Sequence, residues 1–147
     1  MVQPLLKRPP ALQVAALCYR ARKGQVELLL ITSRGTGRWI IPKGWPIDGR
    51  DGPGTALQEA WEEAGIKVGR VSSAAIGQFA YGKRLENNAV VPCLAEVYAL
   101  RVDKMSNDFP ERKQRRRKWV TPKRAAKMVD EPELKELLRH FTPPHHP

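Results

Sequence analysis

The sequence contains few of the residues that build covalent or soft-metal frameworks. It has 2 cysteines, Cys18 and Cys93, and 3 histidines in 147 residues. The two cysteines are far apart, neither belongs to a Cys-x-x-Cys pair, and two of the histidines lie in the Pro-rich final segment. A disulfide framework or a structural zinc site needs more ligands at closer spacing. We therefore predict two reduced cysteines in the apolar core.

Long apolar runs are also lacking. No stretch approaches the roughly 20 apolar residues that a membrane-spanning helix requires. The first ten residues hold Lys7, Arg8 and three prolines, which do not form the apolar region of a secretory signal. We expect a cytoplasmic protein without membrane contact, with one domain over residues 11–141. A tail over 1–10 and a disordered Pro/His tail over 142–147 are expected to flank it.

Negative charge is scarce. The 15 Asp and Glu residues are outnumbered by 26 Lys and Arg, which gives a net charge of +11. Residues 111–127 contain nine basic residues and one glutamate, so this segment carries +8 of the +11. A basic run beside Trp119 is compatible with a nucleic-acid patch, a site for a polyphosphorylated small molecule, or a solvated surface.

Apolar residues are spaced as in strands over much of the chain and as in helices at three places. Period-two alternation over 12–18 and an apolar run over 26–31 predict a hairpin with its turn at Lys23-Gly24. Further expected elements are strands over 39–41, 76–79 and 90–100, a Gly/Pro-rich loop over 43–54, and helices over 53–64, from Thr121-Pro122 onward and over 133–141. The mixture predicts an α+β fold.

The first predicted helix carries three carboxylates on one face. Glu59, Glu62 and Glu63 stand at positions i, i+3 and i+4, opposite an apolar stripe of Leu57, Ala60, Trp61 and Ala64. Like charges at this spacing destabilise a helix by about 0.2–0.5 kcal/mol per pair. A bound hard cation such as Mg²⁺ would relieve this repulsion and would hold phosphate oxygens as well. The alternative is a solvated acidic face.

The sequence around this helix resembles the Nudix box. That motif is a 23-residue loop–helix–loop written G-x5-E-x7-R-E-U-x-E-E-x-G-U, where U is a bulky aliphatic residue. Between residues 44 and 66 the matching positions hold Gly44, Glu59, Glu62, Glu63, Gly65 and Ile66, with Ala60 at the middle U. The chain is therefore similar to the Nudix hydrolases. This resemblance implies an α/β/α sandwich with a mixed central sheet around the loop–helix–loop.

Two positions depart from the motif. Arg50 replaces its first Glu, and Gln58 replaces the Arg before the next Glu. Both positions usually support the fold and orient the helix carboxylates, so their joint loss suggests that another interaction has taken over. Asp48 and Asp51 are candidates for part of the lost role. Because the three helix glutamates are retained, we expect an active enzyme.

The resemblance implies a role for each retained residue. Nudix enzymes hydrolyse nucleoside diphosphates linked to another group, and similar pyrophosphates, by attack of water on phosphorus. Glu59 and Glu63 would be ligands of Mg²⁺, with Mn²⁺ as an alternative, and the backbone carbonyl at Gly44 is a further candidate ligand. Glu62 would be the general base that removes a proton from the attacking water.

Substrate choice depends on residues outside the box. The Trp39-Ile-Ile-Pro-Lys-Gly-Trp45 segment and the basic run before Trp119 look like those of the diphosphoinositol polyphosphate phosphohydrolases, which also cleave diadenosine polyphosphates. Both substrates are dense polyanions that suit basic side chains. The candidate phosphate-binding residues are Arg34, Arg38, Lys43, Lys83, Arg84, Arg115 and Arg117.

Several alternatives remain open. Gln13 stands where the inositol branch would be expected to have a basic residue, which keeps dinucleoside polyphosphates close behind. Other possible substrates are ADP-ribose, nucleotide sugars and the 5′ end of RNA. A non-catalytic module that binds polyphosphate or nucleic acid is favoured only by Arg50 and Gln58. We expect a polyphosphorylated small molecule as the partner rather than nucleic acid; the sequence does not indicate the oligomeric state.

Overall fold

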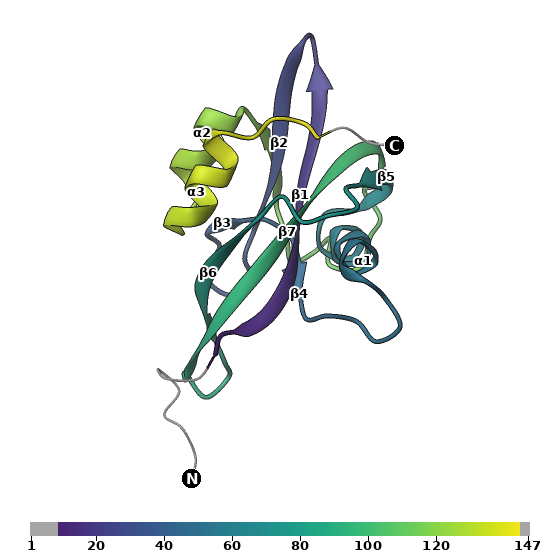
Figure 1. Ribbon diagram of the computed structural model, residues 1–147. Coiled ribbons are helices and arrows are strands. Elements are labelled where there is room, and N and C mark those ends of the chain that lie inside the picture. Colours follow the sequence, from purple (N-terminus) through teal and green to yellow (C-terminus); the bar gives the residue numbers. More distant parts are fainter. Residues whose placement is uncertain (1–8, 145–147) are drawn as a thin grey trace.

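One mixed β-sheet forms the centre of the molecule in the computed structural model, which describes residues 9–144 (Figure 1). Its strand order is β3-β2-β1-β7-β5, with β4 paired to β1, β6 to β7 and β8 to β2. The strands are β1 (Ala11–Arg22), β2 (Gln25–Thr32), β3 (Trp39–Ile40), β4 (Lys43–Gly44), β5 (Ile66–Val71), β6 (Gly77–Arg84), β7 (Val90–Met105) and β8 (Arg117–Val120). Pairing of β1 with β7 is parallel and the other pairings are antiparallel, so the sheet is mixed as predicted.

Strand β1 changes its partner along its length. Its last residues, Tyr19–Arg22, pair with β2, whereas Val14 and Ala15 pair with β4. The backbone amide of Ala16 donates to the carbonyl of Pro42 (2.9 Å) at the point where the partners change. Strand β2 therefore separates from the first half of β1, and β4 holds the start of the Nudix-like loop against the sheet.

Helices cover both faces of the sheet (Figure 1). Helix α1 (Gly52–Ala64) packs on one face, where Ala16, Leu29 and Leu100 belong to the same core cluster. Helices α2 (Pro122–Met128) and α3 (Pro132–Arg139) pack on the other face, against a core that includes Leu17, Phe79, Val97 and Leu134. The predicted α/β/α sandwich is thus confirmed.

The ends of α1 follow from its sequence. The side chain of Asp51 accepts a hydrogen bond from the amide of Gly54 (2.7 Å), and Pro53 occupies the first turn. Gly65 ends the helix with a φ of 74°, a left-handed conformation that suits glycine. The buried side of the helix consists of Ala56, Ala60 and Ala64 with Thr55 and Glu63; Leu57 and Trp61, which the periodicity places in the buried stripe, are only partly buried.

Three short strands were not expected from the sequence. Residues of β4 lie in the predicted Gly/Pro-rich loop, and β5 and β8 contain charged residues such as Lys67 and Lys118 that obscure any alternation. These strands form because β1, β7 and β2 offer them backbone partners that lie far away in the chain. Long-range pairing of this kind leaves little local signal.

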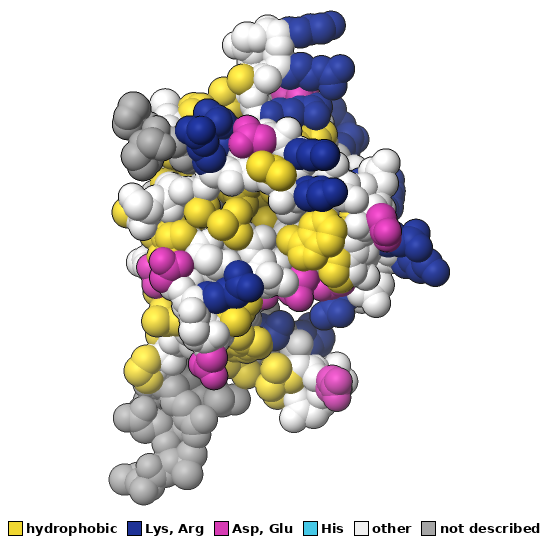
Figure 2. All heavy atoms as spheres, turned by 90° about the vertical axis from the view of Figure 1, so that its right-hand side faces the viewer, with side chains coloured by type: hydrophobic (Ala, Val, Ile, Leu, Met, Phe, Trp, Pro, Cys, Tyr) yellow, Lys and Arg dark blue, Asp and Glu magenta, His cyan; other side chains and the backbone are white. Residues whose placement is uncertain are grey.

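Other sequence predictions have varied outcomes. Cys18 and Cys93 are free and buried, as expected. Among residues 9–144 no helix is long and apolar enough to cross a membrane. Residues 1–8 and 145–147, which make up most of the two predicted tails, lie outside the described part of the chain. Figure 2 shows Lys and Arg side chains at several separate places on the side seen, including a column beside hydrophobic side chains.

Candidate active site

A cleft of about 900 Å³ opens where β1 changes its partner. Its walls come from β1, the loop after β2, β4 and the loop that follows it, one side of α1, the end of β6 and the segment before β8. The lining residues are Gln13, Ser33, Arg34, Gly35, Ile40, Lys43, Gly44, Trp45, Pro46, Ile47, Glu59, Glu63, Lys83, Arg84, Glu111 and Arg115. The cleft thus collects two of the three helix glutamates together with five basic residues.

The two glutamates lie one helical turn apart and face β4. Glu63 is 7% exposed and accepts a hydrogen bond from the backbone amide of Lys43 (3.3 Å). The carboxyl group of Glu59 occupies the space in which a side chain at residue 44 would begin, so any residue other than glycine would have to displace that carboxyl group. The backbone of Gly44 and both carboxyl groups therefore meet within one small region.

Electrostatics in this region favour a bound cation. Burial, a hydrogen bond with Glu63 and repulsion from Glu63 and Glu62 raise the pKa of Glu59 to about 8. Burial also raises the pKa of Glu63, although the guanidinium of Arg115 opposes this effect. The raised pKa values mean that the basic groups nearby do not fully offset the cost of the negative charges on Glu59 and Glu63. A bound cation would stabilise both carboxyl groups in their ionised form.

The donor set fits an open magnesium-type site. Among residues 9–144 no three His, Cys, Asp or Glu side chains converge into a closed cation cage. Mg²⁺ is usually held by one or two carboxylates, with water and substrate phosphate completing its ligands. Glu59, Glu63 and the carbonyl of Gly44 supply oxygen donors of this type. Glu62 does not line the cleft, so the helix contributes two carboxylates rather than three.

Basic side chains also line the cleft. Burial lowers the pKa of Lys43 to about 8, against the opposing attraction of Glu63 and Glu131. Its Nζ lies 4.8 Å from the centre of the Tyr81 ring, and the Nζ of Lys83 lies 5.7 Å from that of Trp45. Arg34 and Arg84 are exposed at the opening. Four predicted phosphate-binding residues are therefore brought together here from three separate segments.

Arg115 also lines the cleft, but its side chain is already occupied. It is 5% exposed and contacts Glu111 at 2.8 Å and Glu63 at 3.5 Å. Its Nη1 also donates to the carbonyl of Thr32 (3.0 Å). This geometry makes Arg115 a support for Glu63. The sequence prediction did not include Glu111, for which the only local signal was its position four residues before Arg115.

The structure does not bring Arg38, Arg117 or Glu62 into the lining of the cleft. Arg38 donates to Glu131 (2.8 Å), a residue 93 positions away in the chain. Arg117 donates to the carbonyl of Ala64 and to that of Ser106 (both 3.0 Å), which fixes the C-terminal end of α1. Glu62 flanks the cleft on α1 and is close enough to raise the pKa of Glu59.

The substituted box positions play no direct part in the cleft. Arg50 and Asp48 are exposed, and Gln58 lines a shallow groove on a different side of α1, next to Trp61. Asp51 caps α1, so it supports the helix without reaching the carboxylates of the cleft. Arg115 instead contacts Glu63 directly. The support that the sequence analysis sought near the box therefore comes from a segment more than 50 residues later.

Two polar side chains meet beside Lys43. Gln13 is 1% exposed, and its side-chain oxygen accepts a hydrogen bond from the hydroxyl of Tyr81. In the sequence, Gln13 stands out only as the absence of an expected basic residue, and Tyr81 has no signal that marks it as part of a site. Their contact joins β1 and β6, whose residues 13 and 81 carry no local signal of being neighbours.

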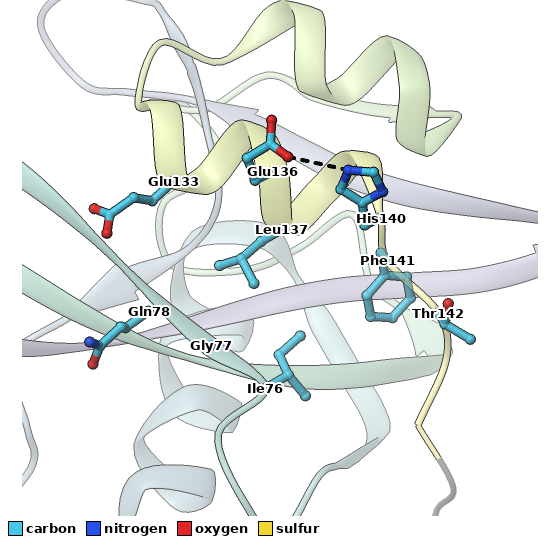
Figure 3. A pocket seen from close by; sticks show the side chains of 9 residues that line it. All are labelled: Ile76, Gly77, Gln78, Glu133, Glu136, Leu137, His140, Phe141 and Thr142. Atoms are coloured by element: carbon cyan, nitrogen blue, oxygen red, sulfur yellow. Dashed lines mark ion pairs between the residues drawn. The ribbon is translucent and has the colours of Figure 1, made fainter.

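A second cavity, of about 580 Å³, lies between α3 and β6 on the opposite face of the sheet (Figure 3). Ile76, Leu137 and Phe141 give it an apolar floor, and Glu136 pairs with His140 (3.2 Å) at its side. None of the described residues that line this cavity is a Lys or an Arg. It therefore lacks the means to hold a polyphosphate, and the cleft beside α1 is the candidate active site.

Comparisons with known proteins found a matching family model and several relatives. The family model described as NUDIX domain matches residues 9–141. The chain is 29% identical over 120 residues to Nudix hydrolase 12, mitochondrial, of Arabidopsis thaliana, covering 80% of this chain and 59% of that protein. It is 31% identical over 121 residues to human diphosphoinositol polyphosphate phosphohydrolase 3-alpha, covering 80% and 68%.

A solved structure shares the fold. The crystal structure of C. elegans Ap4A hydrolase superimposes with a TM-score of 0.65 at 22% identity, covering 89% of this chain and 95% of the other. Nudix hydrolases generally use divalent metal ions, which agrees with the paired glutamates in the cleft. With the family model extending over nearly the whole described chain, this protein belongs to the Nudix hydrolase family.

Proposed function

We propose that the protein is a Mg²⁺-dependent hydrolase that cleaves pyrophosphate bonds in highly phosphorylated small molecules by attack of water on phosphorus. The observation that carries this proposal is the convergence of Glu59 and Glu63 with five basic side chains in one cleft. Carboxylates suit a divalent cation and basic side chains suit phosphate, so the cleft can hold a metal–phosphate complex.

Each residue of the cleft has a proposed task. Glu59, Glu63 and the carbonyl of Gly44 would hold Mg²⁺, or Mn²⁺ in its place. When bound, the metal neutralises phosphate charge and lowers the pKa of a coordinated water. Arg34, Lys43, Lys83 and Arg84 would bind the phosphates that are not cleaved, and Arg115 would keep Glu63 in position.

Glu62 is the proposed general base. It lies on α1 between the two cleft glutamates in sequence and interacts electrostatically with Glu59. It flanks the cleft on α1, and this closeness to Glu59 supports the proposed role.

Two substrate classes are proposed from the relatives. One relative is named as a diphosphoinositol polyphosphate phosphohydrolase, and the structural neighbour is named as an Ap4A hydrolase. Both names denote enzymes that act on small molecules with several phosphates. A cytoplasmic location and a small-molecule partner, rather than nucleic acid, also stay as predictions.

Hydrolysis of a substrate panel tests the proposal. The panel contains a diphosphoinositol polyphosphate, diadenosine penta- and hexaphosphate, ADP-ribose and triphosphorylated RNA, each with Mg²⁺ and with EDTA. We expect turnover of at least one of the first three that requires Mg²⁺. Glu62→Gln and Glu63→Gln should each lower kcat by about 10²–10⁴-fold. Glu136→Gln, on α3 and remote from the cleft, is the matched control and should retain full activity.

Two results would contradict the proposal. Wild-type rates in both Glu62→Gln and Glu63→Gln would show that these carboxylates take no part in the reaction. A folded protein that binds polyphosphate but hydrolyses nothing in the panel would instead be a binding module.

A further inference from the structure

The outer edge of strand β6 borders the second cavity. Among residues 9–144, β6 pairs with β7 and with no other strand, so its opposite edge has no strand partner. The amide of Ala80 points to that edge, because it donates to the carboxylate of Glu133 on α3 (2.7 Å). Hydrogen-bonding direction alternates along an antiparallel strand, so the amide of Gln78 points the same way. Gln78 is exposed and lines the cavity, which therefore has backbone hydrogen-bonding groups in its wall.

The second cavity is acidic in a strongly basic protein. Its described lining contains Glu133 and Glu136 but no Lys or Arg, whereas the whole chain carries +11. One oxygen of Glu133 accepts from Ala80, and the other has no partner within residues 9–144. Glu136 is already paired with Arg139 and with His140 (3.2 Å). A cationic side chain that enters the cavity therefore finds a free acceptor on Glu133.

An apolar surface lies beside this acidic part. Figure 3 shows Glu133 and Gln78 at one end of the cavity and Phe141 at the other, with Leu137 between them. Ile76, Leu137 and Phe141 are only partly buried, at the border of the core. The cavity volume of about 580 Å³ lies in the range of known ligand sites. An apolar group that fills this end would remove the three side chains from water.

Together these features favour an extended peptide as the occupant. A free strand edge is recognised by another strand, which adds main-chain hydrogen bonds and places alternate side chains in pockets. Residues two apart in a strand point to the same side, so one such pair can place an apolar side chain against Leu137 and a basic one against Glu133. A second copy of the chain is disfavoured, because two molecules that each carry +11 repel each other.

We propose that the second cavity and the outer edge of β6 form a docking site for an extended segment of a partner protein, in which an apolar residue stands two positions before a Lys or Arg. The segment continues the sheet beyond β6 through hydrogen bonds to the backbone of Gln78. Its apolar side chain packs on Leu137 and Phe141, and its basic side chain pairs with Glu133. The site lies on the face of the sheet opposite α1, so docking does not depend on the proposed hydrolase function.

Fluorescence anisotropy with labelled peptides tests this site. The probe is the end-blocked peptide Thr-Thr-Leu-Thr-Lys-Thr-Thr, whose threonines favour an extended backbone, and it is titrated with the full chain. Replacing the leucine of the probe by alanine should weaken binding at least about 5-fold, because the apolar side chain loses its burial. Replacing the lysine of the probe by glutamate should also weaken binding at least about 5-fold, because attraction to Glu133 becomes repulsion.

Variants of the protein test the two kinds of contact separately. Gln78→Pro removes an amide that faces away from β7, which an edge strand tolerates. It should weaken probe binding by about 2- to 12-fold, the range that corresponds to one backbone hydrogen bond, whereas Gln78→Ala should retain the affinity. Glu133→Gln keeps an acceptor for Ala80 and should abolish the preference for lysine over glutamate in the probe. Glu86→Gln, at an exposed position in the β6–β7 turn, is its matched control and should retain that preference.

Several results would overturn the docking site. These are no saturable binding of the probe up to about 1 mM, equal affinities for the lysine and glutamate peptides, or equal affinities of folded Gln78→Pro and Gln78→Ala. The peptide replacements leave the protein unchanged, so they test the site whatever the stability of Gln78→Pro. A concentration-dependent dimer that Gln78→Pro disrupts, without binding of the probe, would assign the edge to a second copy and overturn the peptide proposal.

Discussion

Two groups of basic residues differ sharply in what they do. Residues 112–127 are the densest basic stretch of the sequence, yet among them only Arg115 lines the cleft. Arg34, Lys43, Lys83 and Arg84 are scattered over 51 positions of the chain and meet in that cleft. The candidate phosphate site therefore lies where the fold brings distant basic residues together, and not where basic residues are most frequent in the sequence.

Part of the dense stretch is committed to structural contacts. Arg112 pairs with Asp108 (3.3 Å), Arg116 lies 5.8 Å from the ring centre of Trp39, and Arg117 fixes the end of α1. Its remaining members include Lys118 on β8 and the exposed Lys123 and Lys127 on α2. The stretch therefore provides structural ties and surface charge, with one residue directed into the site.

The largest expected effect comes from that one residue. Arg115→Met would leave Glu63 and Glu111 without their buried cation, and loss of one partner of a buried ion pair costs about 3–5 kcal/mol. We expect a large fall in Tm, weaker Mg²⁺ binding and a fall in kcat of at least about 10²-fold, with partial recovery in Arg115→Lys. Thermal unfolding and Mg²⁺ titration measure this. A variant with unchanged Tm and Mg²⁺ affinity, and only a higher KM, would make Arg115 a direct phosphate ligand instead.

A smaller effect on kcat/KM is expected when a basic residue of the cleft, rather than one of the dense stretch, is replaced. Lys43→Gln removes a charge from the cleft, and a hydrogen bond to a charged group contributes about 1.5–3 kcal/mol. This corresponds to a fall in kcat/KM of about 10- to 100-fold. Lys118→Gln and Lys127→Gln, its controls in the dense stretch, should change kcat/KM by less than about 2-fold. Steady-state kinetics on one panel substrate measure kcat/KM for the three variants. A larger fall in Lys118→Gln or Lys127→Gln than in Lys43→Gln would show that the dense stretch, rather than the cleft, binds the substrate.

The smallest expected effect is on stability and depends on pH. The pKa of Glu59 is raised from 4.5 to about 8 in the metal-free protein, so the folded state binds more protons than the unfolded chain between these values. The stability that this gives is complete below pH 4.5 and is lost as pH rises to about 8. In EDTA, the Tm should therefore fall by a few degrees more in wild type than in Glu59→Gln over this range.

Bound Mg²⁺ should compensate for the loss of stability that occurs as the pH rises. Mg²⁺ competes with protons for the carboxylates, so its affinity should increase towards pH 8, and added Mg²⁺ should raise the Tm of wild type but not of Glu59→Gln. The comparison of Tm values is limited to pH values up to about 8. Above this pH the lowered pKa of Lys43 makes the folded state bind fewer protons than the unfolded chain, so that group increases stability as the pH rises. A difference in Tm between the two proteins that does not vary with pH would contradict the assigned pKa of Glu59.

The box helix could be predicted in detail because its signals are local. Asp51, Pro53 and Gly65 mark its ends, and the spacing of its glutamates identifies the family. The contacts of Arg38 and Arg117 have no such local signal, since their partners, Glu131 and Ala64, lie 93 and 53 positions away. Strands β5 and β8 were missed because their pairing partners, on β7 and β2, are also remote in the chain. Contacts that depend on tertiary packing leave no pattern in a single sequence.

Gly44 is held against Val14 by strand pairing, and its backbone and side-chain positions respond differently to mutation. A backbone carbonyl cannot be deleted by any amino-acid substitution, so the candidate metal ligand at residue 44 persists as long as β4 stays in register. A side chain at the same position would meet the carboxyl group of Glu59, which would have to shift to make room. Even Gly44→Ala, the smallest possible replacement, would thus act on the site by displacing a neighbouring residue, and an inactive variant at residue 44 would report on Glu59.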